Sequence, residues 1–199
     1  MTIEQKTQDA IWVAKALFDR NKVSGSSANL SFRHEDWIYI TGSGTCFGRL
    51  NTDSFSVMDL DGKHVYGIPP SKEAPMHLML YRASTRVQAV VHTHSFYSTL
   101  WSCLQGIDPD DAIPSITPYL KMKVGRIALV PYAAPGSEQL FAHMQSRLPA
   151  GDGYILQNHG PVITGSSIMD AFYGIEELEE SARIAWTLRE VPEGGYHRI

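Results

Sequence analysis

The chain has 199 residues, of which 43% are hydrophobic and 19% are charged. This length and balance are typical of one globular domain with a sizeable core, and we expect a single domain over residues 1–199. A formal net charge of −4, with no local cluster of Lys and Arg, argues against nucleic acid or a membrane surface as a partner.

The cysteines and the N-terminus bear on the cellular compartment. Cys46 and Cys103 lie far apart without metal-ligand spacing, which is typical of two reduced thiols. The first ten residues are polar, with no apolar signal core, and no apolar run approaches the length of a membrane span. We therefore expect a cytoplasmic protein.

Hydrophobic periodicity predicts alternating helices and strands. In the first half it predicts, in chain order, a helix over 4–20, a small-residue loop at 24–31, a strand at 37–40, a hairpin over 56–66 and a helix from about 71 to 82. In the second half it predicts a strand at 87–92, a helix at 96–104, a strand at 127–131, a helix at 136–147, a strand at 154–157 and a long helix over 167–189. The alternation predicts an α/β protein, and the hairpin predicts a mixed sheet.

Two histidines end the strand predicted at 87–92, in the stretch V-V-H-T-H-S. Side chains two residues apart on a strand point to the same side, so the Nε2 atoms of His92 and His94 can converge on one ion. The same spacing also occurs where a strand simply ends in polar residues. The pair alone leaves both interpretations open.

A third histidine repeats the arrangement in the stretch Q-N-H-G-P. His159 follows the strand predicted at 154–157, and Gly160 permits a sharp turn directly after it. Viewed singly, His159 could equally be a hydrogen-bonded turn residue. Three histidines at strand ends together favour a metal site, because ligands of open α/β sheets bind beyond strand ends. Three imidazoles suit Zn²⁺ with one open position, and Mn²⁺, Fe²⁺ or Co²⁺ stay open as alternatives.

The stretch Ser71-Lys72-Glu73 comes where a helix is predicted to begin. Ser71 can cap the helix, whose free N–H groups form an anion site, and Lys72 adds a point charge suited to phosphate. Glu73 is a candidate fourth metal ligand or general acid/base. Alternatively, Glu73 only offsets the helix dipole.

Two further segments are rich in small residues and hydroxyl groups. They are S-A-N-L-S around Asn29 and I-T-G-S-G at residues 40–44. Thr41, Ser43 and Gly44 can offer hydroxyl and backbone donors to a phosphate. Such segments are more often ordinary turns.

With these residues in view, the chain resembles the class II aldolase/adducin family. The motifs A-N-L-S, I-T-G-S-G, P-S-K-E, V-V-H-T-H-S and L-Q-N-H-G follow in order over nearly the whole length. The resemblance implies a three-layer α/β/α fold with a central mixed, largely antiparallel sheet, and a homotetramer with active sites at subunit interfaces. It also implies a metal bound by His92, His94 and His159, with Glu73 as catalytic acid/base. The residues it implies for the phosphate are Asn29, Ser43, Gly44, Ser71 and Lys72.

Within the family, the stretches T-C-F-G-R-L (45–50) and I-T-P-Y-L-K-M-K-V-G (116–125) look closest to the 3-oxo-tetronate 4-phosphate decarboxylases. This implies a metal-dependent lyase that releases CO₂ and dihydroxyacetone phosphate through an enediolate. Tyr119 matches a tyrosine that reaches a neighbouring subunit's site in related aldolases, and it is the second catalytic candidate. Lys123 or Lys121 would orient the substrate carboxylate, unless both are solvated surface lysines.

Two alternatives stay open. The first is a sugar-phosphate aldolase or 4-epimerase of the L-fuculose-phosphate aldolase type, which would use the same metal site. The second is a non-catalytic, adducin-like interaction domain, which predicts a degraded metal site. His77, four residues after Glu73, is expected to pack near the site rather than to bind the metal.

Overall fold

A single eight-stranded sheet forms the centre of the molecule. The computed structural model describes residues 1–149, 151–192 and 194–197. The sheet order is β4-β3-β2-β1-β5-β8-β7-β6. The strands are β1 (Asn29–His34), β2 (Trp37–Thr41), β3 (Phe55–Asp59), β4 (His64–Gly67), β5 (Ala89–His92), β6 (Ile127–Val130), β7 (Gly153–Leu156) and β8 (Gly160–Gly165). Neighbouring strands are antiparallel except β6 and β7, so the expected mixed, largely antiparallel sheet is confirmed.

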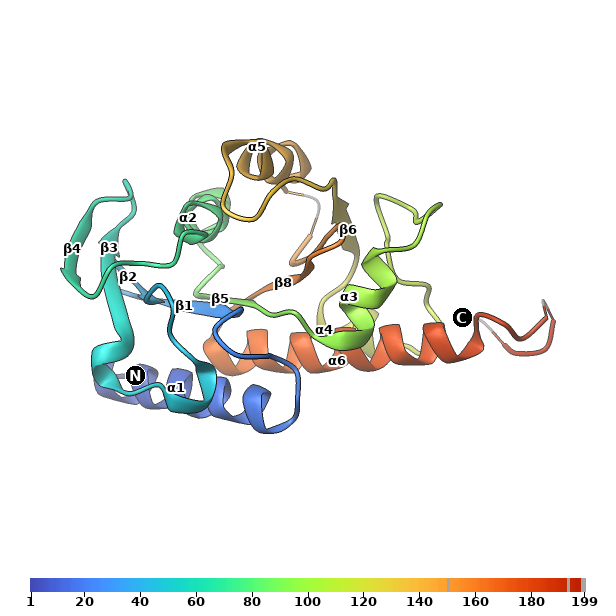
Figure 1. Cartoon of the computed structure of the whole chain (residues 1–199), viewed down its shortest axis with the longest axis horizontal. Coiled ribbons are helices and arrows are strands. Elements are labelled where there is room, and N and C mark those ends of the chain that lie inside the picture. The colour runs from blue at the N-terminus through green and yellow to red at the C-terminus, as the bar shows by residue number, and fades with distance from the viewer. Residues whose placement is uncertain (150, 193, 198–199) are drawn as a thin grey trace.

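Helices cover both faces of the sheet, as Figure 1 shows. The helices are α1 (Ile3–Asp19), α2 (Ala74–Ala83), α3 (Phe96–Ser102), α4 (Tyr119–Lys123), α5 (Glu138–Arg147) and α6 (Ile168–Leu188). One buried apolar cluster joins α1 and α6 to one face, and a second joins α2 and α5 to the other. The α/β/α layering implied by the resemblance is therefore confirmed.

The apolar and polar residues of β1 and β5 divide between these two layers. Leu30 and Phe32 of β1 point into the cluster with α1 and α6. Asn29 and Ser31 alternate with them and therefore face α2. In β5, Val90 packs in the α2 layer, so His92, two residues later, lies on the same side. The α2 face of the two central strands thus carries the polar residues.

Two strands were not predicted. The segment of β1 was interpreted as a loop, because its serines and asparagine are typical of turns. In the structure β1 is central and pairs with both β2 and β5. The segment of β8 begins with Gly160-Pro161, residues that rarely occur inside a central strand. It pairs with β5 and β7 over its length, and its apolar residues Val162 and Ile163 are fully buried.

The start of α2 also differs from the prediction. Glu73, and not Ser71, is the N-cap residue, and the helix proper begins at Ala74 with Pro75 in its first turn. Pro70 pairs with Gly42, and the Ser71 N–H donates to the Thr41 carbonyl, so both residues continue the edge of the sheet. Because of these pairings the helix begins only after Glu73, and Glu73 lies at the point where the chain turns.

None of the helices in the described part of the chain is both long and apolar enough to span a lipid bilayer.

Candidate metal centre

The strand β5 delivers the first two histidines. His92 is the last residue of this interior strand and is fully buried between β1 and β8. Its Nδ1–H donates to the carbonyl oxygen of Pro161, 2.8 Å away. A carbonyl oxygen only accepts, so this bond fixes the tautomer and leaves the lone pair of Nε2 free. His94 follows in the connection to α3.

The third histidine lies in the tight turn between β7 and β8. Asn158 adopts a left-handed conformation with φ of 54°, which directs the next residue, His159, back toward the end of β5. Gly160 then passes very close to β5, because a Cβ atom there would lie 2.3 Å from the carbonyl oxygen of Thr93. Only glycine permits this approach, and the approach brings His159 to the other two rings.

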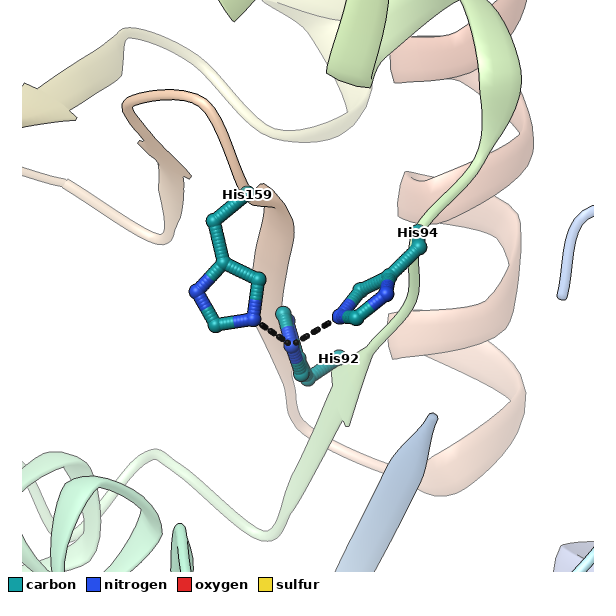
Figure 2. Close-up of side chains that lie close together, drawn as sticks. All are labelled: His92, His94 and His159. Atoms are coloured by element: carbon teal, nitrogen blue, oxygen red, sulfur yellow. Dashed lines mark hydrogen bonds between the residues drawn. The ribbon is translucent and has the colours of Figure 1, made fainter. Parts of the chain in front are cut away.

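The three imidazoles converge, as Figure 2 shows. His92 Nε2 lies 3.2 Å from His94 Nε2 and 3.3 Å from His159 Nε2. One ring nitrogen from each residue lies within 4.8 Å of the others. The expected meeting of strand-end histidines is what the structure shows.

The carboxylate of Glu73 closes the cluster. Glu73 Oε2 lies 3.4 Å from His92 Nε2, and Glu73 Oε1 lies 3.5 Å from His159 Nε2. The side chain is 3% exposed. His92, His94 and His159 are placed to hold one metal ion and Glu73 lies against them, and we call these four side chains the metal-binding cluster.

The dimensions of the metal-binding cluster fit a tetrahedral cation. With metal–nitrogen distances of about 2.0–2.1 Å, neighbouring donors of a tetrahedral zinc lie about 3.3–3.4 Å apart. His92 Nε2 lies 3.2 and 3.3 Å from the other two imidazole nitrogens, close to this value, and the two Glu73 oxygens lie 3.4 Å from His92 and 3.5 Å from His159. In the described part of the chain, Glu73 Oε1 is buried without a hydrogen-bond partner. A cation at the centre would satisfy it.

The protonation states favour the same conclusion. Burial lowers the pKa of His94 to about 4 and that of His159 to about 4, and it lowers the pKa of His92 as well. Burial alone would raise the pKa of Glu73, but His92 and the hydrogen bond from Asn29 outweigh it, and the pKa is lowered. At neutral pH the cluster therefore offers three neutral imidazoles and one carboxylate, which is the donor set that zinc prefers.

A buried hydrogen-bond chain, which no sequence pattern indicated, holds Glu73. Asn29 Nδ2 donates to Glu73 Oε2 over 2.8 Å, and Asn29 Oδ1 lies 2.6 Å from His77 Nε2. Because an amide oxygen only accepts, His77 Nε2 carries the proton and His77 Nδ1 accepts from Ser31 Oγ over 2.7 Å. Ser31 Oγ in turn accepts from the Tyr81 hydroxyl over 2.8 Å. His77 is thus one step removed from the metal-binding cluster, as expected.

The register of β1 and β5 makes this chain possible. Asn29 stands opposite His92 in the pairing of the two strands, so both side chains point toward α2. The amide of Asn29, implied for phosphate by the resemblance, has its oxygen bonded to His77 and one N–H bonded to Glu73.

An open cavity of about 240 Å³ adjoins the metal-binding cluster. We call it the site pocket; its lining includes Ser26, Ser27, Asn29, Ser43, Gly44, Ser71, Lys72, Glu73, Pro135, His94 and His159. The structure thus brings all five residues implied for phosphate binding to one cavity beside the histidines. Ser26, Ser27 and Pro135 were not predicted; the serines precede A-N-L-S directly, which is the one signal that could have found them.

Three residues from the stretch 116–125 lie elsewhere. Tyr119 is 60% exposed and lines a shallow surface hollow with Met122 and Tyr173. Lys123 forms an ion pair with Asp170, and Lys121 forms one with Asp111. Within one chain, none of the three lines the site pocket.

The fold and this cluster define a class of protein. The chain belongs to the class II aldolase and adducin family: the family's model, described as the Class II Aldolase and Adducin N-terminal domain, matches residues 8–186. Members of this family depend on a divalent metal, and the histidine cluster is the matching feature of this chain.

Individual relatives narrow the comparison. The chain is 39% identical to 3-oxo-tetronate 4-phosphate decarboxylase of Haemophilus influenzae over 180 residues, which cover 90% of this chain and 86% of that protein. It is 37% identical to L-fuculose phosphate aldolase of Methanococcus maripaludis over 181 residues, covering 91% and 96%. The crystal structure of YgbL from Escherichia coli superimposes with a TM-score of 0.92 at 36% identity, covering 97% and 92%.

Proposed function

We propose that the chain is a metal-dependent carbon–carbon lyase that decarboxylates a 3-oxo-tetronate 4-phosphate to dihydroxyacetone phosphate and CO₂. The observation that carries the proposal is the metal-binding cluster, complete and open to the site pocket. Identity of 39% to a protein named for this reaction, over nine-tenths of the chain, supports the choice of substrate. An adducin-like scaffold has no need of a complete cluster, so a non-catalytic role is disfavoured.

We propose that His92, His94 and His159 hold the cation, with Glu73 as the fourth group, and that the cation is Zn²⁺. Mn²⁺, Co²⁺ and Fe²⁺ also accept imidazole and carboxylate donors, and a metal analysis decides among them. When bound, the cation supplies positive charge beside the ketone oxygen on which negative charge develops.

The reaction needs two movements of electrons and one proton. The C1–C2 bond breaks and CO₂ leaves, and its electron pair forms a C2–C3 double bond while the ketone π pair moves to oxygen. The resulting enediolate then accepts one proton at C2 and becomes dihydroxyacetone phosphate. Glu73 is ionised in the resting site, so it delivers a proton that it has first accepted from solvent. The buried bond from Asn29 holds its carboxylate in place for this transfer.

The site pocket would hold the phosphate with neutral donors. Ser43, Gly44 and Ser71 line the cavity near the start of α2, and Ser26 and Ser27 lie on the same cavity wall as Asn29. Hydroxyl and backbone N–H groups of this kind bind phosphate oxygens. The resemblance supports the same assignment for Asn29 and Lys72.

We further propose a homotetramer in which Tyr119 acts in the site of a neighbouring copy, as the alternative proton donor to Glu73. Tyr119 is exposed beside Met122 and Tyr173 in an apolar hollow of the surface. A second copy of the chain that packs against this hollow would bury it. Lys123 or Lys121 would reach the substrate in the same way. The cytoplasm is the proposed compartment, because Cys46 and Cys103 are both free thiols.

One assay tests the reaction against its alternative. Metal-replete protein is incubated separately with 3-oxo-tetronate 4-phosphates and with L-fuculose 1-phosphate, and CO₂, aldehyde and dihydroxyacetone phosphate are measured. The proposal predicts CO₂ and dihydroxyacetone phosphate in equal amounts from the keto acid. Aldehyde from the sugar phosphate, without CO₂ from any keto acid, would instead make the chain an aldolase, which the 37% identity to L-fuculose phosphate aldolase keeps as the second candidate.

A further inference from the structure

Lys72 is the cationic side chain of the site pocket. Among the residues that line this cavity, it is the one lysine, and no arginine lines it. Its hydroxyl-bearing neighbours, Ser43 and Ser71, are neutral. Lys72 is therefore the one cationic side chain that a substrate with a phosphate and a carboxylate meets in this cavity.

The charge of Lys72 is not neutralised within the chain. In the described residues Lys72 forms no ion pair and no hydrogen bond, whereas Lys121 and Lys123 each pair with an aspartate. A lysine without a carboxylate partner beside a ligand cavity is free to bind an anion. The two paired lysines would first have to give up Asp111 and Asp170.

The stem of Lys72 passes close to the loop between β6 and α5. A Cβ atom on Gly136 would lie 3.0 Å from Lys72 Cδ and 3.1 Å from Lys72 Cγ. Gly136 has φ of 77°, so glycine is favoured there both by the backbone and by the lysine. Lys72 is exposed, and its stem runs beside the loop that brings Pro135 to the site pocket.

Lys72 lines the same cavity as the open side of the metal-binding cluster. The site pocket is lined by Lys72, His94 and His159, whereas His92 does not line it. Lys72 therefore lies on the side from which a substrate approaches.

From this placement we infer that Lys72 binds the carboxylate of the substrate and so selects phosphorylated keto acids over sugar phosphates that lack a carboxylate. The inference rests on the proposed function and changes one part of it: the serines and Gly44 hold the phosphate, whereas Lys72, which the resemblance implies for the phosphate, binds the carboxylate instead. Lys72 makes a binding contact and takes no part in proton transfer. When CO₂ leaves, this contact is released together with it.

The test compares two ligands that the protein does not turn over. Dihydroxyacetone phosphate carries a phosphate and no carboxylate, whereas a four-carbon aldonate 4-phosphate carries both. Their dissociation constants are measured by calorimetry on the metal-loaded protein, for wild type and Lys72→Met. We expect the dissociation constant of the aldonate phosphate to rise about 10- to 100-fold, the loss for one charged hydrogen bond, and that of dihydroxyacetone phosphate to change little.

Two controls keep the result interpretable. Lys63→Met removes a lysine from the exposed hairpin of β3 and β4, and both dissociation constants should stay at the wild-type value. Gly136→Ala displaces the Lys72 stem without removing the charge, and it should weaken binding of the aldonate phosphate more than that of dihydroxyacetone phosphate. Metal content and the circular dichroism spectrum show that each variant is folded and loaded.

Other outcomes would overturn the inference. An equal loss for both ligands in Lys72→Met would assign the lysine to the phosphate, and no loss for either would make it a solvated lysine. Failure of the proposed function is a separate result, namely no CO₂ from any keto acid with wild-type protein. The binding measurement requires no turnover, so it still tests the role of Lys72 in that case.

Discussion

The imidazole nitrogens of His94 and His159 lie 3.2 and 3.3 Å from His92 Nε2, and the carboxylate of Glu73 lies against His92 and His159. The Nδ1–H of His92 donates to the Pro161 carbonyl, so the Nε2 lone pair of His92 faces the centre of the cluster. Burial lowers the pKa of His94 and of His159 to about 4, so these rings are neutral at neutral pH. Neutral rings that converge in this way support the proposed metal site.

Glu73 has two parts in this account, as a fourth group of the metal-binding cluster and as the acid/base. Glu73→Gln keeps the size and the hydrogen-bonding capacity of the side chain but removes its ability to take up and deliver a proton. We expect kcat for CO₂ release to fall by about 10²- to 10⁴-fold. Steady-state kinetics at saturating metal provide the measurement. A variant with wild-type kcat would remove Glu73 from proton transfer.

His77 gives a prediction on stability. Burial lowers its pKa to about 3, with His92 acting in the same direction. The unfolded chain, with an ordinary histidine pKa of about 6.5, therefore binds one more proton than the folded chain between pH 3 and 6.5. As the pH falls through this window, the free energy of unfolding should decrease by roughly 1.4 kcal/mol for each pH unit on account of His77.

The matched variant is His77→Gln, which cannot take up a proton in this range. Urea unfolding of both metal-free proteins at several pH values between 4 and 7 isolates the contribution, because all other histidines are shared. The variant should lose stability less steeply on acidification. Parallel curves would show that His77 is not buried in the neutral form.

Among the secondary-structure elements and their connections, the turn between β7 and β8 determines where His159 lies. Gly160→Ala would bring a Cβ atom onto the carbonyl of Thr93, so either the turn or the end of β5 must move. Overpacking of this kind costs about 1–3 kcal/mol of stability. His159 belongs to this turn, so we expect metal affinity to fall as well, measured by competition with a chelator.

A variant at a second glycine distinguishes the effect of this steric clash from the effect of backbone strain. Gly106 has φ of 74°, and a Cβ atom there would meet nothing within 4 Å. Gly106→Ala should therefore reduce stability without reducing metal affinity. Equal metal affinity in both variants would contradict the role given to the close approach of the turn and β5.

The elements that carry the histidines could be predicted because a local sequence pattern marks them. Apolar runs that end in histidine mark β5 and β7 in the sequence itself, and His92, His94 and His159 were identified in this way. The strand β1 was missed because its residues are small and polar. Its place at the centre of the sheet follows from pairing with β2 and β5, which no local pattern encodes.

The surroundings of Glu73 depended on that same pairing. The bond between Asn29 and Glu73 requires Asn29 to stand opposite His92, and His77 joins them only because α2 packs over both strands. The environment of the lysines was equally non-local. Lys123 of α4 forms its ion pair with Asp170 of α6, and the stem of Lys72 lies close to Gly136, far along the chain.

At the scale of the whole molecule, the account requires more than one chain. Tyr119 lies outside the site pocket of its own chain, on an exposed apolar hollow. Mixing subunits tests this directly. Glu73→Gln and Tyr119→Phe are each expected to have low activity, and tetramers assembled from both, by unfolding and refolding them together, should regain part of it. A site between a Glu73→Gln chain and a Tyr119→Phe chain can combine the intact Tyr119 of the first with the intact Glu73 of the second.

No gain of activity over the separate variants would contradict a shared site. Refolding each variant alone provides the control for the procedure, and light scattering shows whether the mixed species are tetramers. If the mixtures are tetramers and remain inactive, Tyr119 acts within its own chain or not at all.

The central claim is that His92, His94, His159 and Glu73 surround one divalent cation, and anomalous X-ray diffraction at the zinc edge from crystals of the zinc-loaded protein tests it most directly. The account predicts one anomalous peak per chain, within about 2.0–2.2 Å of the three Nε2 atoms and a Glu73 carboxylate oxygen. A peak elsewhere in the molecule, or no peak in protein that has been given zinc, would contradict it.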